Sequence, residues 1–465
     1  MRRWVLPAAL AAICVVAGAL AVAPATVPSL LDGPGIRAPV LSARRAPGVV
    51  AELVADQRLR TDLDAILADP ALGGARQQSC LVVHHGDRPI VSRRGEARLI
   101  PASTLKVLTA QAALARLGLD DRFVTEVRAT APVAGGGVVA GNLFVVGGGD
   151  PLLATADYAA SFANQPQVTT PFERLADALV EAGVRTVQGG VLGDESRYDT
   201  QRYIPTWKPS YREDGDVGPS SALAVNDGFV AYRPRPVPAD QPAAHAAAVL
   251  TGLLQERGVP VAGAPGQGTA PAGTTVLAGL ASPPVGVIVA EMLKESDNVT
   301  AESLVKELGH RFGTGGTTSA GIQVIRDTLV ADGLPAGGLA AVDGSGLDRS
   351  DRASCDLLMA ALTASGPGGT VATGFPVAGR DGTLAMRFVG HPAAGRMRAK
   401  TGSLSGVVGL AGFLDASDPA AGAPLSFALL ANDLPRDTLG RTLQEDLAGA
   451  MARYPDAPPR EDLVP

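Results

Sequence analysis

The C-terminal part of the chain constrains the fold most, because it reads as three strands followed by a helix. The strands are expected over 395–404, 407–416 and 424–433, and the helix over 438–454. Three consecutive strands of this kind form a meander that a terminal helix can cover. Near the other end of the chain, "CLVVHHGDRPIVS" at 80–92 reads as a hairpin,. The two ends are therefore predicted to share one sheet in an α+β domain.

The region between these ends differs in character. Residues 121–279 carry short valine-rich strands, one of them expected over 222–232, which are broken by glycine and proline clusters, with one helical stretch at 171–183,. A chain of 465 residues is too long for one typical core,. We therefore expect a discontinuous domain made of 49–120 and 280–460, which is split by one or two β-rich insertions over 121–279.

The N-terminal segment resembles a targeting signal. Two arginines precede an uncharged apolar stretch over 5–23, and small residues follow it. Residues 1–25 are therefore predicted to be a secretory signal peptide cleaved after Ala25, or a signal anchor, since the stretch can just span a bilayer. Residues 26–48 are proline-rich and are expected to form a linker,. Both alternatives place the folded part outside the cytoplasm, secreted to the cell wall or anchored to the outer face of the plasma membrane.

Composition argues against several partner classes. The chain has 40 Lys and Arg against 46 Asp and Glu, a net charge of −6, and no long basic run. A nucleic-acid partner is therefore not expected. The five histidines show no metal-ligand spacing, so we predict no metal and no other cofactor,. Cys80 and Cys355 lie beyond the N-terminal segment and could form one disulfide or remain two buried thiols,.

Lysine is scarce, and its placement is informative. Only five of the 40 basic residues are lysines, and Lys106 stands in an apolar run three residues after Ser103, at the start of a helix expected over 103–117,. This spacing places both side chains on one face of a helix. A serine needs a base to become a nucleophile, and burial or a neighbouring cation can make lysine neutral, whereas arginine keeps its charge. The helix N-terminus also favours a developing anion at Ser103.

Two further motifs give this pair weight. S-D-N at 296–298 lies at a break between two predicted helices, and K-T-G at 400–402 lies on a predicted strand, whose glycine would let a ligand approach the backbone,. The order S-x-x-K, S-D-N, K-T-G indicates serine-based acyl transfer. Taken singly, each motif has a structural alternative. The serine of S-D-N could simply cap the following helix, and the lysine of K-T-G could simply keep an edge strand soluble. A second S-x-x-K, Ser303 to Lys306, is not followed by comparable motifs. It is interpreted as a helix-packing serine and a solvated lysine.

With these motifs the chain resembles the penicillin-recognising serine enzymes, and among them the low-molecular-mass class C penicillin-binding proteins, which are D-alanyl-D-alanine carboxypeptidase/endopeptidases. The 193 residues from Ser103 to Ser296 leave room for the domain that these proteins insert, whereas β-lactamases keep this gap far shorter. Three stretches support the narrower match: "VVGGGDPLL" (145–153), "DGSGLDR" (343–349) and "GRDGTLAMRF" (379–388).

The resemblance implies a penicillin-binding/β-lactamase-like transpeptidase domain, an antiparallel sheet flanked by helices and split by a β-rich inserted region. It also implies an enzyme that cleaves peptidoglycan stem peptides through an acyl-enzyme and that β-lactam antibiotics acylate. Ser103 would attack the carbonyl between two D-alanines, and Lys106 would take its proton. Ser296 would pass the proton to the leaving D-alanine, Asn298 would hold Lys106 and the substrate amide, and Lys400 would keep the potential of the site positive.

By the same resemblance, Thr401 and Gly402 would bind the terminal carboxylate end of the substrate. Backbone N–H groups of Ser103 and Ser403 would form the oxyanion hole. Some relatives recognise a diaminopimelate side chain, which Asp150 and Arg349 could bind here. A turn-forming Asp150 and a surface Arg349 are the alternative.

Two competing functions remain open. One is a β-lactamase or esterase on the same scaffold, although no E-x-x-L-N element stands between S-D-N and K-T-G to supply a deacylation base. The other is a non-catalytic protein that binds the cell wall. The complete set of motifs argues against it, since a degenerate copy need not keep Lys106, Ser296 and Lys400 together.

Overall fold

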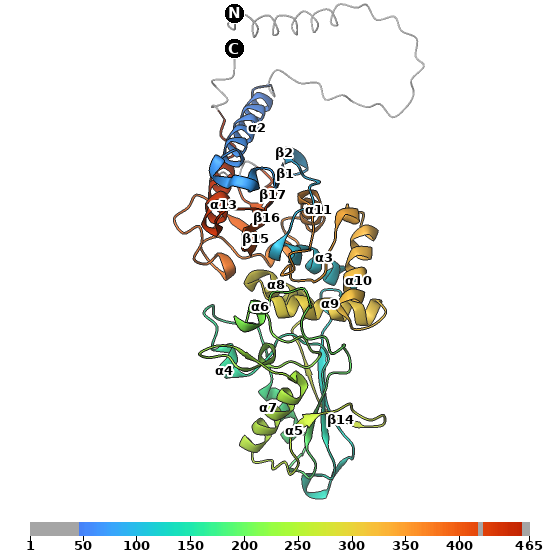
Figure 1. Ribbon diagram of the computed structural model, residues 1–465. Coiled ribbons are helices and arrows are strands. Elements are labelled where there is room, and N and C mark those ends of the chain that lie inside the picture. Colours follow the sequence, from blue (N-terminus) through green and yellow to red (C-terminus); the bar gives the residue numbers. More distant parts are fainter. Residues whose placement is uncertain (1–45, 417–421, 458–465) are drawn as a thin grey trace, which may run out of the picture. The chain divides into compact units, whose positions relative to one another are not determined.

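The computed structural model describes residues 46–416 and 422–457 (Figure 1). The predicted segments 1–25 and 26–48 therefore lie outside the described residues, except that 46–48 begin helix α2 (Ala46–Leu67). None of the described helices is long and apolar enough to cross a membrane.

The first sheet has five strands in the order β15-β16-β17-β1-β2, and every neighbouring pair is antiparallel. The C-terminal meander and the early hairpin thus share one sheet, as predicted. The pairing of β1 with β17 joins the two ends of the domain through residues 79–85 and 425–431. Their bounds are β1 (Ser79–His85), β2 (Arg88–Arg93), β15 (Met397–Leu404), β16 (Val407–Leu414) and β17 (Leu425–Ala431).

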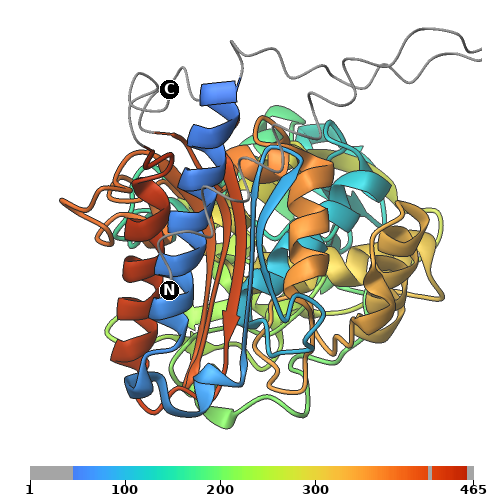
Figure 2. The same cartoon turned by 90° about the horizontal axis from the view of Figure 1, so that it is seen from above.

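Both faces of this sheet are buried, which explains why its central strands are almost wholly apolar. Along β1, Leu81 and Val83 face one core, and Cys80 and Val82 face the other, because successive side chains point to opposite faces. Helices α2 and α13 (Asp437–Ala452) cover the first face (Figure 2). On the second face lie the helices α3 (Lys106–Leu117), α8 (Val285–Glu295), α9 (Asn298–Phe312), α10 (Thr318–Ala331) and α11 (Cys355–Ser365).

A disulfide links the sheet to the helices of the second face. Cys80 of β1 is bonded to Cys355, the first residue of α11, with the two Cα atoms 6.0 Å apart. Both cysteines are buried in the same core. Of the two alternatives left open by the sequence, the structure contains the disulfide.

A second five-stranded sheet lies within the region between the two ends of the chain. Its order is β13-β10-β6-β3-β14, with β10 parallel to both of its neighbours and the remaining pairs antiparallel. Helices α5 (Glu173–Glu181) and α7 (Pro242–Glu256) pack on it around a separate core. The strands are β3 (Val124–Ala129), β6 (Leu143–Val146), β10 (Val191–Asp194), β13 (Gly266–Gln267) and β14 (Thr275–Ala281).

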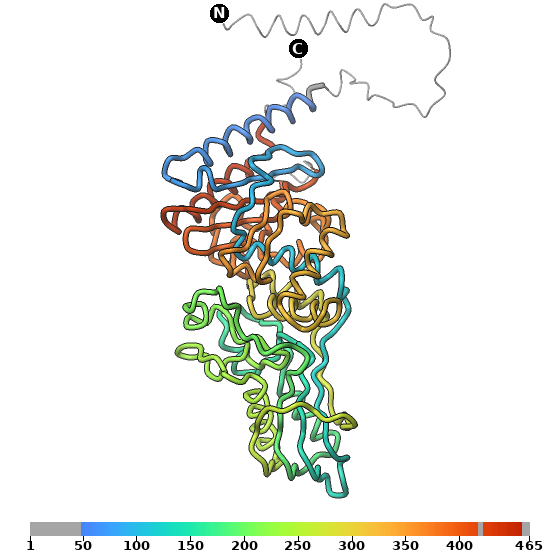
Figure 3. The backbone as a smooth tube through the Cα atoms, turned by 45° about the vertical axis from the view of Figure 1, so that its right-hand side comes forward, coloured from blue at the N-terminus to red at the C-terminus, as the bar shows by residue number. Residues whose placement is uncertain are grey.

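The chain enters and leaves this region at neighbouring points. Val124, at the start of β3, pairs with Ala281, at the end of β14, so the two passages run side by side (Figure 3). One compact unit, 52–458, contains both sheets. The domain boundaries expected at 121 and 279 therefore stay a prediction.

Two expectations for this region were wrong in detail. The fifteen-residue helix α7 was not predicted, although its alanines have the highest helix propensity,. The stretch 222–232 was predicted to be a strand, but only β11 (Phe229–Ala231) is extended there. Asn226 and Asp227 adopt left-handed backbone angles, which break the strand,.

Shorter elements complete the described chain. They are the 3-10 helices η1 (Pro70–Arg76), η2 (Ala102–Leu105), η3 (Gly135–Gly137), η4 (Asn226–Gly228), η5 (Ala336–Gly338) and η6 (Gly382–Leu384), the helices α4 (Ala156–Ala159), α6 (Pro209–Glu213) and α12 (Thr370–Thr373), and the strands β4 (Val133–Ala134), β5 (Val138–Val139), β7 (Leu153–Ala154), β8 (Thr170–Pro171), β9 (Thr186–Val187) and β12 (Val237–Pro238).

Candidate active site

Ser103 lies on a tight turn rather than in the α-helix that was predicted from 103 onward. It belongs to η2, and α3 begins three residues later at Lys106. The preceding residue, Ala102, has a φ of +47°, which is uncommon for a residue with a side chain,. Such strained positions occur where the surrounding structure fixes a functional turn.

The amine of Lys106 is buried and lies among neutral acceptors. Its Nζ donates to Oγ of Ser103 at 3.2 Å, to Oδ1 of Asn298 at 2.6 Å and to the carbonyl of Ser345 at 2.7 Å. The side chain has no exposed surface. The structure thus brings Ser103, Lys106 and Asn298 together, as the sequence motifs predicted.

The S-D-N motif forms the junction between α8 and α9. Ser296 ends α8 in a left-handed conformation with a φ of 62°, and Asp297 caps α9 by accepting from the N–H groups of Val299 and Thr300. This cap directs Asn298, the first residue of α9, toward Lys106,. The Nδ2 of Asn298 donates to the carbonyl of Asp216 at 2.7 Å. A backbone group from the region between the two ends of the chain therefore orients the side chain of Asn298.

Lys400 lies opposite, on the edge strand β15. Its Nζ donates to Oγ of Ser296 at 2.8 Å and to the carbonyl of Thr401 at 2.8 Å. A Cβ atom at Gly402 would lie 2.7 Å from the carbonyl of Pro101, a distance that real Cβ atoms do not show. The glycine therefore lets β15 lie directly against the turn that carries Ser103.

Burial shifts both lysines toward the neutral form. It lowers the pKa of Lys106 to about 8, although the carboxylates of Asp343, Asp297 and Glu302 act in the opposite direction. It also lowers the pKa of Lys400 well below its usual value, and the charge of Lys106 lowers it further. Only neutral oxygens accept the hydrogen bonds of Lys400, and the expectation that Lys400 keeps the potential of the site positive stays a prediction.

The remaining residues of the K-T-G strand line the same edge. Oγ1 of Thr401 lies 3.4 Å from Oγ1 of Thr383, which belongs to the "GRDGTLAMRF" stretch. Ser403 is exposed on β15, where it pairs with Val408 of β16. Thr401 and Ser403 thus follow Lys400 along one strand, next to the turn of Ser103.

The two residues suggested for a diaminopimelate side chain have different surroundings. Asp150 is buried and accepts from the N–H of Leu152 at 2.9 Å, which is the turn-forming alternative,. Burial raises the pKa of Asp150 to about 6. Arg349 is exposed and donates to the carbonyl of Ser405 at 2.8 Å. Their role in binding stays a prediction.

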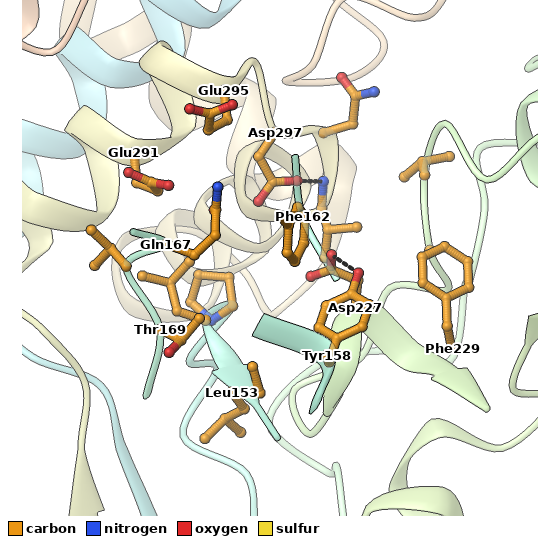
Figure 4. A pocket seen from close by; sticks show the side chains of 18 of the residues that line it. Leu153, Tyr158, Phe162, Gln167, Thr169, Asp227, Phe229, Glu291, Glu295 and Asp297 are labelled. Atoms are coloured by element: carbon orange, nitrogen blue, oxygen red, sulfur yellow. Dashed lines mark hydrogen bonds between the residues drawn. The ribbon is translucent and has the colours of Figure 1, made fainter. Parts of the chain in front are cut away.

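A cavity of about 360 Å³ adjoins the S-D-N motif. Ser296 and Asn298 belong to its wall, and residues 151–154 and 215–218 line it from the other region. Figure 4 shows Glu291 and Glu295 on one side of the cavity and Tyr158 beside Asp227 on the other, where the hydroxyl of Tyr158 donates to Asp227 at 2.6 Å. Five carboxylate side chains contribute to the lining, from Asp216, Asp227, Glu291, Glu295 and Asp297.

Sequence reasoning missed two acceptors that act through their backbone. The carbonyl of Ser345 accepts from Lys106, and the carbonyl of Asp216 accepts from Asn298. The stretch "DGSGLDR" was a signal for the first, but only Arg349 was singled out from it. Nothing in the side chain of Asp216 could have indicated the second, because the contact uses only the backbone.

The second S-x-x-K pair was interpreted incorrectly. Lys306 is buried instead of solvated, and its Nζ lies 2.6 Å from a carboxylate oxygen of Asp199 and 2.8 Å from the carbonyl of Gln201. The sequence could not show this, because Asp199 and Gln201 come from the region that folds against α9. Ser303 is buried on the same helix, as expected.

Comparison with known proteins agrees with the site. Residues 59–239 and 231–454 match the model of the D-Ala-D-Ala carboxypeptidase 3 (S13) family. The chain is 31% identical over 453 residues to a D-alanyl-D-alanine carboxypeptidase of Actinomadura sp. strain R39, with 80% of this chain and 81% of that protein covered. It is 29% identical to the carboxypeptidase DacB of Mycolicibacterium smegmatis, with 84% and 83% covered.

Solved structures show the same fold. The crystal structure of penicillin-binding protein 4 from Haemophilus influenzae has a TM-score of 0.68 and 21% identity, and the match covers 83% of this chain and 96% of that one. A predatory endopeptidase from Bdellovibrio bacteriovorus has a TM-score of 0.52 and 17% identity, covering 82% and 94%. The predicted α+β fold, a penicillin-binding protein domain, is confirmed.

Family and fold together confirm the resemblance inferred from the three motifs. This chain belongs to the D-Ala-D-Ala carboxypeptidase 3 (S13) family and is a serine-type carboxypeptidase.

Proposed function

We propose that this protein is an exported D-alanyl-D-alanine carboxypeptidase/endopeptidase that cleaves peptidoglycan stem peptides, with Ser103 as nucleophile and Lys106 as base. One observation carries these roles: the buried amine of Lys106 lies 3.2 Å from Oγ of Ser103, and neutral acceptors take its other two hydrogen bonds. A lysine in such surroundings gives up its proton far more readily than one in water.

Acylation would proceed by attack of Oγ of Ser103 on the carbonyl carbon between the last two D-alanines. Lys106 takes the hydroxyl proton, and the backbone N–H groups of Ser103 and Ser403 receive the developing oxyanion. When the C–N bond breaks, Ser296 passes a proton to the leaving amine. Water then hydrolyses the ester and regenerates Ser103. A carboxypeptidase and an endopeptidase would differ only in the amine that leaves.

Lys400 has a place in this scheme even though its pKa is lowered in the free protein. The terminal carboxylate of a substrate bound at Thr401 would bring a negative charge close to Lys400, which favours the protonated form of its amine. Charge on Lys400 in turn disfavours charge on Lys106,. Substrate binding would therefore favour positive charge on the carboxylate-binding side and the neutral form of the base.

The acidic cavity beside the S-D-N motif supports a preference for substrates that carry an amine. Glu291 and Glu295 lie one helical turn apart on α8 and both line the cavity. Burial, and then the charge of Glu295, raise the pKa of Glu291 to about 7, and a cationic group bound beside them would favour the charged form of both. A stem peptide with an amine on its third residue fits this site better than one with an uncharged side chain. The suggested contacts of Asp150 and Arg349 with such a side chain remain part of the proposal.

Export is supported by the N-terminal pattern and by the disulfide. Structural disulfides form in oxidising compartments, and Cys80 and Cys355 are bonded in the core. The substrate also lies outside the cytoplasmic membrane.

Intact-protein mass after incubation with benzylpenicillin tests the proposed function. Oγ of Ser103 attacks the β-lactam carbonyl and the ring C–N bond breaks, but the amine stays attached, so we expect the wild type to gain the mass of one benzylpenicillin. Ser103→Ala, the matched control, should gain nothing. Unmodified protein with hydrolysed benzylpenicillin would indicate a β-lactamase instead, and unmodified protein with intact benzylpenicillin would favour a non-catalytic protein that binds the cell wall.

A further inference from the structure

A buried glutamate holds the backbone loop that supports the base. Glu302 lies on α9, one turn after Asn298, and only 3% of its surface is exposed. Its Oε1 accepts from the N–H groups of Gly344 and Ser345 at 3.0 and 2.8 Å. The carbonyl of the same Ser345 accepts from Nζ of Lys106 at 2.7 Å. A continuous chain of hydrogen bonds thus runs from Glu302 to Lys106.

The opposite side of this loop is fixed against the helix of the base. Oγ1 of Thr109, on α3, donates to the carbonyl of Gly344 at 2.8 Å. Gly346 has a φ of +83°, and a Cβ atom there would overlap the carbonyl of Ala102, in the turn that carries Ser103. The loop is therefore a spacer between α9 and the Ser103–Lys106 pair, and Glu302 is its attachment on α9.

We propose that Glu302 is a positioning residue: through the backbone of 343–346 it fixes the carbonyl that accepts from Lys106, and so fixes the amine of Lys106 beside Ser103. The proposal rests on the proposed function, since it assigns Lys106 the role of base. Glu302 would contact neither substrate nor the reacting atoms and would act only through the loop. An error of about 1 Å in placing a reacting group costs roughly 100-fold in rate.

The negative charge of Glu302 has a second effect, because it acts on the pKa of Lys106. The negative form of Glu302 raises the pKa of Lys106. Burial, and then the carboxylate of Asp343, raise the pKa of Glu302 itself to about 8, so this charge acts on Lys106 only in the pH range where both groups titrate. Removing it should therefore make Lys106 lose its proton at somewhat lower pH within that range. The other charged groups that act on Lys106 and Glu302 remain in place, namely Asp297, Asp343, Lys306 and Lys400.

The test measures the rate of acylation by benzylpenicillin against pH in three variants. Glu302→Ala removes the acceptor and should slow acylation by about 100-fold. Glu302→Gln keeps an acceptor at the same length and should recover most of this loss, with the acidic limb of the pH profile moved to lower pH. Glu307→Gln is the matched control: Glu307 is equally buried on α9 but pairs with Arg197 and Arg311. Glu307→Gln should lower the free energy of unfolding and leave the pH profile of acylation unchanged.

The pKa of Lys106 can also be read without any reaction. The chain has only five lysines, so NMR of labelled lysine side chains can follow Lys106, assigned by its loss in Lys106→Met. We expect a lower pKa in Glu302→Gln than in the wild type. An unchanged pKa and pH profile, or an equal shift in Glu307→Gln, would overturn the inference even if Glu302→Ala does not fold. A wild type that benzylpenicillin does not acylate would instead contradict the proposed function, while the NMR titration still decides the role of Glu302.

Discussion

The two S-x-x-K pairs of this chain have the same spacing and different chemistry. Lys106 and Lys306 are both buried, and each stands three residues after a serine. The amine of Lys106 donates to Ser103 and to two neutral oxygens, whereas the amine of Lys306 pairs with the carboxylate of Asp199. Burial lowers the pKa of both amines, and at Lys306 the hydrogen-bonded carboxylate of Asp199 opposes that shift. The charge of the hydrogen-bond partner therefore affects how readily a buried amine becomes neutral.

The local backbone differs as well. Ser103 lies on a 3-10 turn after a strained residue, and Nζ of Lys106 reaches its hydroxyl. Ser303 lies in the middle of α9, and Lys306 donates to the carbonyl of Gln201 and to Asp199. One pair belongs to an open site, and the other connects α9 to the region between the two ends of the chain.

Replacing Lys106 should have the largest effect. Lys106→Met removes the proposed base while keeping an apolar side chain of similar length, and we expect acylation by benzylpenicillin to fall by about 1,000-fold. The matched change at the second pair, Lys306→Met, should leave acylation near the wild-type rate. Stopped-flow or quenched mass measurements give both rates. Equal losses in the two variants would show that both lysines act only through folding.

Giving Lys106 the environment of Lys306 should have the next largest effect. In Asn298→Asp a carboxylate replaces the amide oxygen 2.6 Å from Nζ. It stabilises the charged lysine and raises its pKa above the value of about 8,. Since the neutral form is the base, acylation at pH 7 should fall by about 100-fold and recover as the pH rises. A pH-independent loss would mean that Asn298 acts only on the substrate.

Removing the charge beside Lys306 should affect stability rather than acylation. Asp199→Asn leaves a buried ammonium without its counter-charge, and we expect the free energy of unfolding to fall by about 2–3 kcal/mol at pH 7. Burial already lowers the pKa of Lys306, and Asp199 opposes that shift. In the variant the folded-state pKa falls further below the unfolded value, so the unfolded state binds more protons and the deficit should shrink as pH rises. Urea denaturation at pH 7 and pH 9 measures this, and a deficit independent of pH would contradict it.

Removing Lys306 itself should have the smallest effect. Lys306→Met takes away the buried charge, and the carboxylate of Asp199, whose side chain is 30% exposed, can turn to water. We expect a loss of about 1 kcal/mol in the free energy of unfolding. A larger loss than in Asp199→Asn would mean that leaving the carboxylate of Asp199 unpaired costs more than leaving the ammonium of Lys306 unpaired.

Much of the fold could be predicted because its signals are local. Strands β16 and β17 of the first sheet are continuous apolar runs with both faces buried, and short connections predict that the meander and the hairpin form neighbouring antiparallel strands,. The helix α7 was not predicted, because the valine-rich segments around it indicate strands, although its own alanines favour a helix,. The strand predicted over 222–232 was wrong in part, because Asn226 and Asp227 adopt left-handed backbone angles that the pattern of hydrophobic residues does not indicate.

The family could be read from three short motifs in a fixed order, and the same motifs predict the nucleophile, the base and the carboxylate-binding strand. The surroundings of each lysine could not be read in this way, because they arise from folding. The acceptors from Ser345 and Asp216 are backbone carbonyls, which every residue has, so no side-chain pattern marks them. The partner of Lys306 lies 107 residues away along the chain. The protonation of a buried amine depends on charges within a few ångströms, and folding alone brings those groups together.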